Sequence, residues 1–126
     1  MYLQDLKSAV HEILIVSPFM RKNRLKQLLP VFTQIVQNGV SVSVVTRPPE
    51  DFTGENADLT NENVQTLEAI GVKVIRKSGF HQKFSVTDNK TVWYGSVNFL
   101  SFGTNEESIM RFESYDLAGI LTDTVL

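Results

Sequence analysis

Cysteine is absent from this chain, and histidine occurs only twice among its 126 residues. Without thiols the chain can form neither a disulfide framework nor a thiolate metal site. Two histidines and scattered acidic residues also leave few ligands for a catalytic metal ion. We therefore expect no metal and no cofactor.

Long apolar runs are absent as well. No uninterrupted stretch approaches the roughly 20 residues that a membrane-spanning helix requires, so we expect a cytoplasmic protein that does not enter a membrane. The net charge of −2 provides no strong field for polyanions, and a site for anions must therefore be local. Two basic groups are candidates: Arg21, Lys22, Arg24 and Lys26, and Arg76, Lys77 and Lys83 beside His81. We interpret the first group as the solvated face of a helix.

Apolar patterns in the first part of the chain alternate between strand and helix. Five segments follow this alternation: strands at 12–16, 40–46 and 72–75, and helices at 22–37 and 61–70. Pro30 is expected to kink the first helix, and the polar stretch 47–58 predicts a loop. Such alternation favours right-handed crossovers and a mainly parallel sheet with helices on both faces.

The pattern changes after residue 80. Two strand-like runs, 83–87 and 91–96, are separated only by a short polar turn and predict a hairpin, so the sheet should be mixed. A strand at 108–112 and the start of a helix at 117–126 complete the pattern. We interpret residues 1–126 as one mixed α/β domain. Because the last helix stops in mid-pattern, we expect this domain to belong to a longer protein.

The hairpin carries a group of polar residues with regular spacing. His81, Lys83 and Asp88 stand as His-x-Lys-x4-Asp, and Gly-Ser-x-Asn follows at 95–98. Asp88 has the opposite parity to the first two residues and sits at a strand end. We therefore expect it to support the turn or a nearby cation without contacting substrate.

The register of the hairpin decides which of these side chains meet. A two-residue turn at 89–90 places Lys83 opposite Ser96 and, further along, His81 opposite Asn98. All four side chains then share one face of the sheet. Three apolar side chains are expected on the other face: Phe84, Val86 and Trp93. A three-residue loop would slip the pairing by one residue, but the two basic side chains would still share a face.

This patch suits attack on a phosphorus atom. A neutral His81 imidazole can act as nucleophile, while a second, protonated imidazole donates a proton to the leaving oxygen. Lys83 and Asn98 can donate hydrogen bonds to the phosphoryl oxygens, and Ser96 can do the same. The other histidine, His11, lacks a lysine two residues on and is expected to be structural.

The motif resembles the signature of the phospholipase D superfamily, which reads His-x-Lys-x4-Asp with a downstream Gly-Ser-x-Asn. The resemblance implies a metal-independent phosphodiesterase and a glutamate beyond Asn98 that orients the imidazole. Glu107 is our candidate, and Glu106 and Glu113 compete with it. Members with a single motif build their site across a two-fold homodimer, so we expect two His81 residues to face each other.

Residues 95–103 and 107–112 are also similar to phospholipase D-like domains attached to bacterial DNA helicases. This similarity implies a DNA or RNA substrate and fusion to, or association with, a helicase. Two alternatives stay open: a catalytically silent module that holds a phosphate in the Lys83–Asn98 pocket, and true phospholipase action. Four phenylalanines can stack on bases or fill the core, and the core is the expected place for each: Phe19, Phe80, Phe99 and Phe102.

Overall fold

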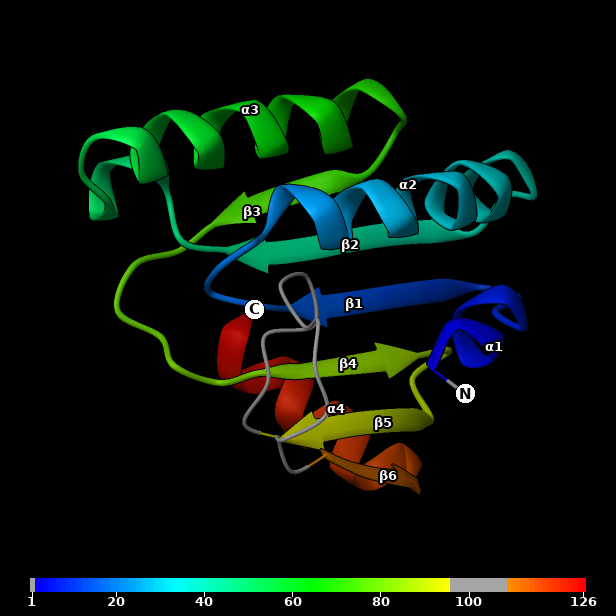
Figure 1. Ribbon diagram of the computed structural model, residues 1–126. Helices are drawn as coiled ribbons and strands as arrows, with labels where there is room; N and C mark the ends of the chain where they lie inside the picture. The colour runs from blue at the N-terminus through cyan, green and yellow to red at the C-terminus, as the bar shows by residue number, and fades with distance from the viewer. Residues whose placement is uncertain (1, 96–108) are drawn as a thin grey trace.

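Six strands form one mixed sheet in the computed structural model, which describes residues 2–95 and 109–126 (Figure 1). In chain order they are β1 (Glu12–Val16), β2 (Ser41–Thr46), β3 (Lys73–Arg76), β4 (Phe84–Thr87), β5 (Thr91–Gly95) and β6 (Ile109–Glu113). Across the sheet the order is β3-β2-β1-β4-β5-β6. β1, β2 and β3 pair in parallel, whereas β4 is antiparallel to β1 and β5, and β6 is antiparallel to β5. Four strands therefore share one direction, as the mixed, mainly parallel prediction requires.

Helices cover both faces of this sheet, as predicted. They are α1 (Tyr2–Lys7), α2 (Lys22–Gln37), α3 (Glu55–Ala69) and α4 (Tyr115–Val125), with a 3₁₀ turn, η1, at Pro49–Asp51. Side chains of α1, α2 and α3 share one buried cluster with alternate residues of β1 and β2, and α4 closes a second cluster on the opposite face. In the described part of the chain, no helix is both long and apolar enough to cross a bilayer.

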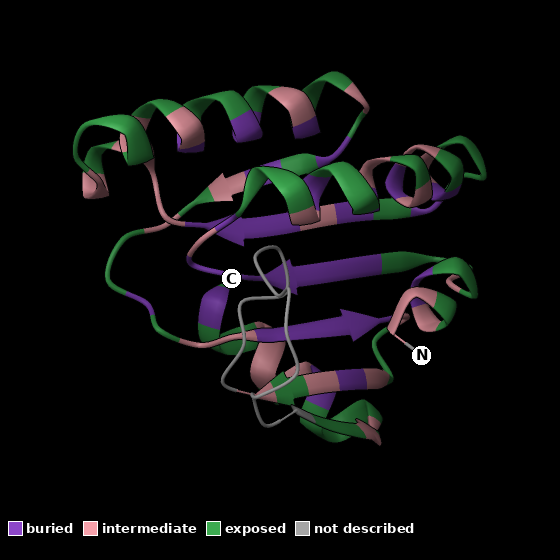
Figure 2. Ribbon diagram, in the orientation of Figure 1, coloured by how far each residue is buried: buried purple, intermediate pink, exposed green. Residues whose placement is uncertain are grey.

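Burial follows from the sequence pattern of each element. Leu25, Leu28, Phe32 and Ile35 recur at helical spacing on α2 and are all buried, which fixes the face that this helix turns to the sheet. β1 is buried along its length after Glu12, and β4 is buried throughout (Figure 2). Because both faces of these central strands are covered, their sequences are nearly continuous apolar runs.

The largest difference from the predicted elements is the start of α3. This helix begins at Glu55, within the stretch that was predicted to be a loop, and Gly54 precedes it with a φ of 58°. The first turn is solvent-exposed and lacks the apolar periodicity that predicted the rest of the helix. Its acidic residues, Glu55 and Asp58, instead favour a helix start because negative charge stabilises the positive end of the helix dipole.

The hairpin turn has three residues, so the predicted two-residue turn is wrong. Thr87 pairs with Thr91, and the loop between them holds Asp88 and Asn89 at positive φ, a conformation that these two residue types tolerate. The register slips by one residue, which turns β5 over. Trp93 therefore pairs with Ser85 and lies on the α1 face, opposite the face of Phe84 and Val86 where it was predicted.

Trp93 of β5 anchors α1 to the part of the sheet formed by β5 and β6. Its indole Nε1 donates to Asp5 Oδ2 at 2.7 Å, and the Tyr2 ring meets it edge-on at 5.6 Å. Arg111 of β6 donates two further bonds to the Asp5 carboxylate, at 2.8 and 3.2 Å. The Arg111 hydrogen bonds, with the Trp93 bond, outweigh partial burial and hold the pKa of the Asp5 carboxyl below its ordinary value.

Asp5→Asn is expected to lower the free energy of unfolding by about 1–2 kcal/mol, because a bidentate charged pair becomes a neutral contact. Urea denaturation at neutral pH measures this change. Glu68→Gln is the matched control, since Glu68 and Arg76 form an ion pair whose side chains are 45% and 44% exposed. Such surface pairs contribute little. Equal losses in the two variants would contradict a special role for Asp5.

Candidate functional site

Several strands end at the same edge of the sheet, which we call the carboxyl edge. Its strands end at Val16 of β1, Thr46 of β2, Arg76 of β3 and Gly95 of β5. The loops that leave β1, β2 and β3 all lie on the left in Figure 1. In open α/β sheets, ligands bind in the crevice outside the carboxyl ends of the parallel strands.

His81 and Lys83 lie at the carboxyl edge because β4 runs in the opposite direction and begins there. Phe84, the first residue of β4, pairs with Val16, the last residue of β1. The carbonyl oxygen of Lys83 accepts a hydrogen bond from Gly95 N at 3.3 Å, which attaches this segment to the end of β5. His81 is exposed and Lys83 is half-buried. Both are therefore positioned where a ligand can reach them.

The segment before β4 is fixed on its other side by phenylalanine packing. Phe80 is 5% exposed and Phe84 is fully buried, and both belong to the cluster beneath α4. Phe80 is thus a core residue, as expected. The buried rings hold the intervening backbone against the sheet while His81 points into solvent, because neighbouring side chains of an extended segment alternate in direction.

Asp88 lies at the far end of β4, about 17 Å from Lys83 along the chain at a rise of about 3.3 Å per residue. Its carboxylate accepts hydrogen bonds from the backbone N–H groups of Val10, His11 and Glu12, the shortest being 2.7 Å from His11 N. Asp88 N also donates to Glu12 O at 2.8 Å. The motif aspartate therefore joins the hairpin turn to the start of β1.

The electrostatics of Asp88 follow from these contacts. Partial burial by itself raises the pKa of the carboxyl, but the three backbone donors and the nearby His11 outweigh it. The net result is a pKa below the ordinary value. Asp88 is therefore charged at neutral pH and links the hairpin turn to the start of β1. This structural role accounts for an aspartate at that place in the motif.

Two residues of the second basic group, Arg76 and Lys77, make contacts within the fold. Arg76 donates to Glu68 Oε1 at 3.3 Å, and Lys77 Nζ donates to the carbonyl oxygens of Thr124 and Val125 at 3.4 Å. Lys77 thereby places a positive charge at the carboxyl end of α4, where the helix dipole favours it. The other two residues of this group are His81 and Lys83, which the motif predicts to contact a ligand.

A cation and two aromatic rings also lie at the carboxyl edge: Arg47 and Phe52 in the stretch predicted only as a polar loop, and Phe19, half-buried although the core was expected, in the loop after β1. Arg47 follows β2 directly and donates through Nε to Asp51 Oδ2 at 3.1 Å. Its guanidinium lies 5.2 Å from the centre of the Phe52 ring, which in turn contacts Phe19. A signal for Arg47 was present in the sequence, because a residue that directly follows a parallel strand reaches the ligand-binding edge.

Three predicted site residues, Ser96, Asn98 and Glu107, lie outside the described residues. The same holds for Glu106, Phe99 and Phe102. The third glutamate candidate, Glu113, ends β6 opposite Thr91 and contacts Arg111 and Lys90. It is therefore at the edge remote from His81.

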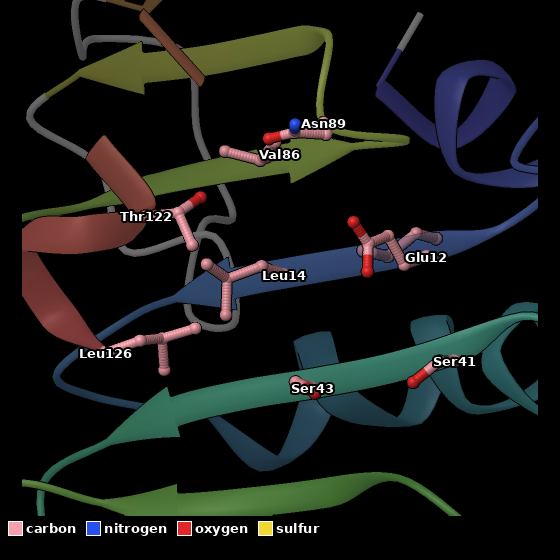
Figure 3. A pocket seen from close by; sticks show the side chains of 9 residues that line it. Glu12, Leu14, Ser41, Ser43, Val86, Asn89, Thr122 and Leu126 are labelled. Atoms are coloured by element: carbon pink, nitrogen blue, oxygen red, sulfur yellow. The ribbon is translucent and has the colours of Figure 1, made fainter. Parts of the chain in front are cut away.

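A pocket of about 100 Å³ lies elsewhere, on the α4 face and toward the opposite edge of the sheet. Figure 3 shows its lining from β1, β2, the hairpin and α4: Glu12, Leu14, Ser41, Ser43, Val86, Asn89, Thr122 and Leu126. Glu12 and Ser41 are the first residues of their strands, so this pocket is distinct from the carboxyl edge. Among the described residues, no three His, Cys, Asp or Glu side chains gather as metal ligands.

Known proteins share this fold over almost the whole chain. Nuc from Salmonella typhimurium, a phospholipase D family member, is 22% identical, with a TM-score of 0.73 over 97% of this chain and 80% of Nuc. NucT from Helicobacter pylori is 14% identical, with a TM-score of 0.76 over 98% of this chain and 81% of NucT. TrmBL2, described as an archaeal chromatin protein with a novel mode of DNA binding, is 13% identical, with a TM-score of 0.63 over 98% of this chain and 45% of TrmBL2.

Sequence comparison identifies the family more directly. No curated protein matches the chain significantly. Residues 2–124 match the model of the family described as "Cardiolipin synthase, PLD-like domain", which covers nearly the whole chain. The similarity of fold agrees with this match. The chain therefore belongs to the phospholipase D-like family, whose enzymes act on phosphodiesters.

Proposed function

We propose that this chain is a metal-independent phosphodiesterase that hydrolyses DNA or RNA through a phosphohistidine on His81. The observation that carries the proposal is the exposed imidazole beside the half-buried Lys83 at the carboxyl edge of a phospholipase D-like sheet. A second histidine must act as general acid. His11 begins the other edge of the sheet, before β1, so the acid is His81 of the partner subunit in a symmetric homodimer.

The proposed reaction has two balanced steps. A ring nitrogen of neutral His81 bonds to phosphorus while the bond from phosphorus to the leaving oxygen breaks, and protonated His81 of the partner subunit gives that oxygen its proton. Water then attacks the phosphorus and breaks the bond to nitrogen. Its proton passes to the neutral His81 of the partner subunit, which returns both imidazoles to their starting states.

Lys83 supports both steps electrostatically in this proposal. Its ammonium donates hydrogen bonds to the phosphoryl oxygens, with Ser96 and Asn98 as further donors and Glu107 as the residue that orients the imidazole. Negative charge grows on those oxygens as phosphorus is attacked, so preorganised donors lower the barrier. Asp88 acts as a positioning residue, because its bonds to the start of β1 set the hairpin that leads to Lys83.

A silent binding module is the second candidate, and the fold of TrmBL2 favours it. That protein shares most of this fold and is described as binding DNA. Here the same edge would hold a phosphate of nucleic acid, and a fused or associated helicase would supply the chemistry. A phospholipase is the third candidate, because the family model is named for a cardiolipin synthase.

Turnover in excess chelator separates these candidates. We expect wild type to hydrolyse single-stranded DNA, double-stranded DNA or bis(p-nitrophenyl) phosphate with EDTA present, and phosphatidylglycerol vesicles only weakly. DNA binding without hydrolysis of any phosphodiester would support the silent module. Faster hydrolysis of the vesicles than of nucleic acid would support the phospholipase.

Lys83→Gln is expected to lower kcat/KM in EDTA by about 100-fold, because one preorganised donor to the phosphoryl oxygens is lost. The assay uses bis(p-nitrophenyl) phosphate and purified protein whose fold is checked by circular dichroism. Lys90→Gln is the matched control, since Lys90 is an exposed lysine of the same hairpin at its other end. Wild-type rates in K83Q would remove Lys83 from the proposed mechanism.

A further inference from the structure

Two aromatic rings and a guanidinium form one cluster at the carboxyl edge. Phe19, in the loop after β1, contacts Phe52, in the loop after β2, with ring centres 5.8 Å apart and planes tilted by 58°. Both rings are half-buried. The Arg47 guanidinium lies over the Phe52 ring at 5.2 Å, within the range of a cation–π contact. Each group thus keeps part of its surface exposed to solvent.

Arg47 is held in place by the neighbouring loops. Its ion pair with Asp51 uses Nε, which leaves both Nη groups outside that bond. Asp51 in turn accepts a hydrogen bond from Ser78 Oγ at 3.0 Å, so the loop after β3 helps to fix the carboxylate. The cluster is therefore preorganised by three loops that leave the same edge of the sheet.

We propose that Phe19, Phe52 and Arg47 form a stacking platform for a nucleobase, which makes an unpaired base of DNA or RNA part of the substrate. This inference rests on the proposed phosphodiesterase function. Single-stranded nucleic acid is bound by aromatic rings and arginine planes on which bases stack, beside cations that contact the backbone. Bases paired within a duplex do not present their faces in this way.

The position of the platform relative to Lys83 supports this substrate. Phe19 follows β1, and β1 is the direct neighbour of β4, whose start carries Lys83 and His81. Phosphate and base are adjacent parts of one nucleotide. A phosphate held at His81 therefore places a flanking base toward the loops after β1 and β2.

The cation in the cluster also argues against a lipid headgroup. Aromatic rings can bind a quaternary ammonium ion such as choline, but a face of Phe52 is already covered by a positive charge. That face is occupied by Arg47, so a second cation cannot use it. A neutral base can instead stack on the arginine plane, whose charge is paired with Asp51.

The test compares binding of two oligonucleotides that differ only in their bases. One is a thymidine 15-mer, and the other has the same length and charge but carries abasic sites throughout. Binding is measured in EDTA with the His81→Asn protein, so hydrolysis does not interfere. We expect Phe52→Leu in this background to weaken binding of the thymidine 15-mer by about tenfold and to leave the abasic strand unchanged.

Two further variants separate stacking from folding. Phe52→Trp keeps a flat π-surface and should bind the thymidine 15-mer at least as well as the parent protein. Tyr115→Leu removes an aromatic ring that is 64% exposed at the start of α4, away from the carboxyl edge, and should change nothing. A loss in F52L that F52W restores therefore supports stacking.

Several outcomes overturn the platform. Equal weakening of both oligonucleotides by F52L, no weakening of either, or no binding by the parent protein each excludes a base-specific contact. The proposed function can fail separately. If the protein binds in a base-dependent way but wild type shows no chelator-resistant hydrolysis, the proposed catalysis is wrong and the platform stands. If wild type hydrolyses nucleic acid but binding shows no preference for bases, the platform is wrong and the proposed catalysis stands.

Discussion

His81→Asn is expected to lower chelator-resistant phosphodiester hydrolysis on the order of 10⁴-fold or more, the largest effect on activity that we predict. Asparagine cannot form the proposed phosphohistidine, and in the proposed symmetric dimer the same change removes the general acid. Because His81 is exposed, the substitution should leave the fold intact. The measurement is the rate of p-nitrophenol release in EDTA, with the urea midpoint recorded for each protein.

His11→Asn is the matched control, because the chain has only these two histidines. His11 is exposed, and its hydrogen bond to Asp88 runs through the backbone N–H, which asparagine also has; only the smallest of the contributions to the pKa of Asp88 comes from its charge. Activity and stability should therefore stay at the wild-type level. If H11N lost as much activity as H81N, the assignment of the nucleophile would have to be abandoned.

Mixing wild type with H81N tests whether one site needs two subunits. When an equal amount of H81N is exchanged into a fixed amount of wild type, mixed forms of the proposed dimer contain a single His81 and should be inactive. The expected activity is then about half that of wild type alone. Additive activity, with no inhibition after subunit exchange, would show that one subunit carries a complete site.

Asp88→Ala is expected to lower the free energy of unfolding by about 3 kcal/mol, the largest effect on stability that we predict. The carboxylate accepts three backbone N–H bonds at the start of β1, and bonds to a charged acceptor contribute more than neutral ones. Alanine also fits poorly at a φ of 53°. Urea denaturation at neutral pH measures the loss.

Asp88→Asn separates charge from backbone conformation. Asparagine tolerates positive φ and keeps one acceptor oxygen, so about 1 kcal/mol should be lost. A loss in D88N as large as that in D88A would assign the whole effect to the charge. Stability of D88A equal to wild type would contradict the structural role altogether.

The stability of wild type should also depend on pH through this residue. The folded-state pKa of Asp88 is depressed, so the stabilisation by its charge is complete above the unfolded value of about 4. That stabilisation is lost as the pH falls through the folded pKa. D88N should therefore show a shallower loss of stability below about pH 4 than wild type. If the stability of wild type and D88N fell equally steeply below about pH 4, the contribution of the Asp88 charge would be contradicted.

Local sequence determined where most helices and strands lie. Apolar runs and helical spacing placed β1, β2, β3 and α2 to within a residue or two, because such patterns reflect which faces each element must bury. The motif around His81 and Lys83 identified the superfamily, which the family model confirms. These features depend on neighbouring residues and can be derived without knowledge of the rest of the chain.

Tertiary structure decided which distant segments meet. The spacing of residues 83–96 allowed two hairpin registers, and the observed one holds Asp88 against backbone groups of Val10 to Glu12, far away in the sequence. The same applies to Asp5, which meets Trp93 and Arg111, and to Phe52, which meets Phe19. Periodicity specifies a face but not its partner, because the partner is chosen by how all elements pack at once.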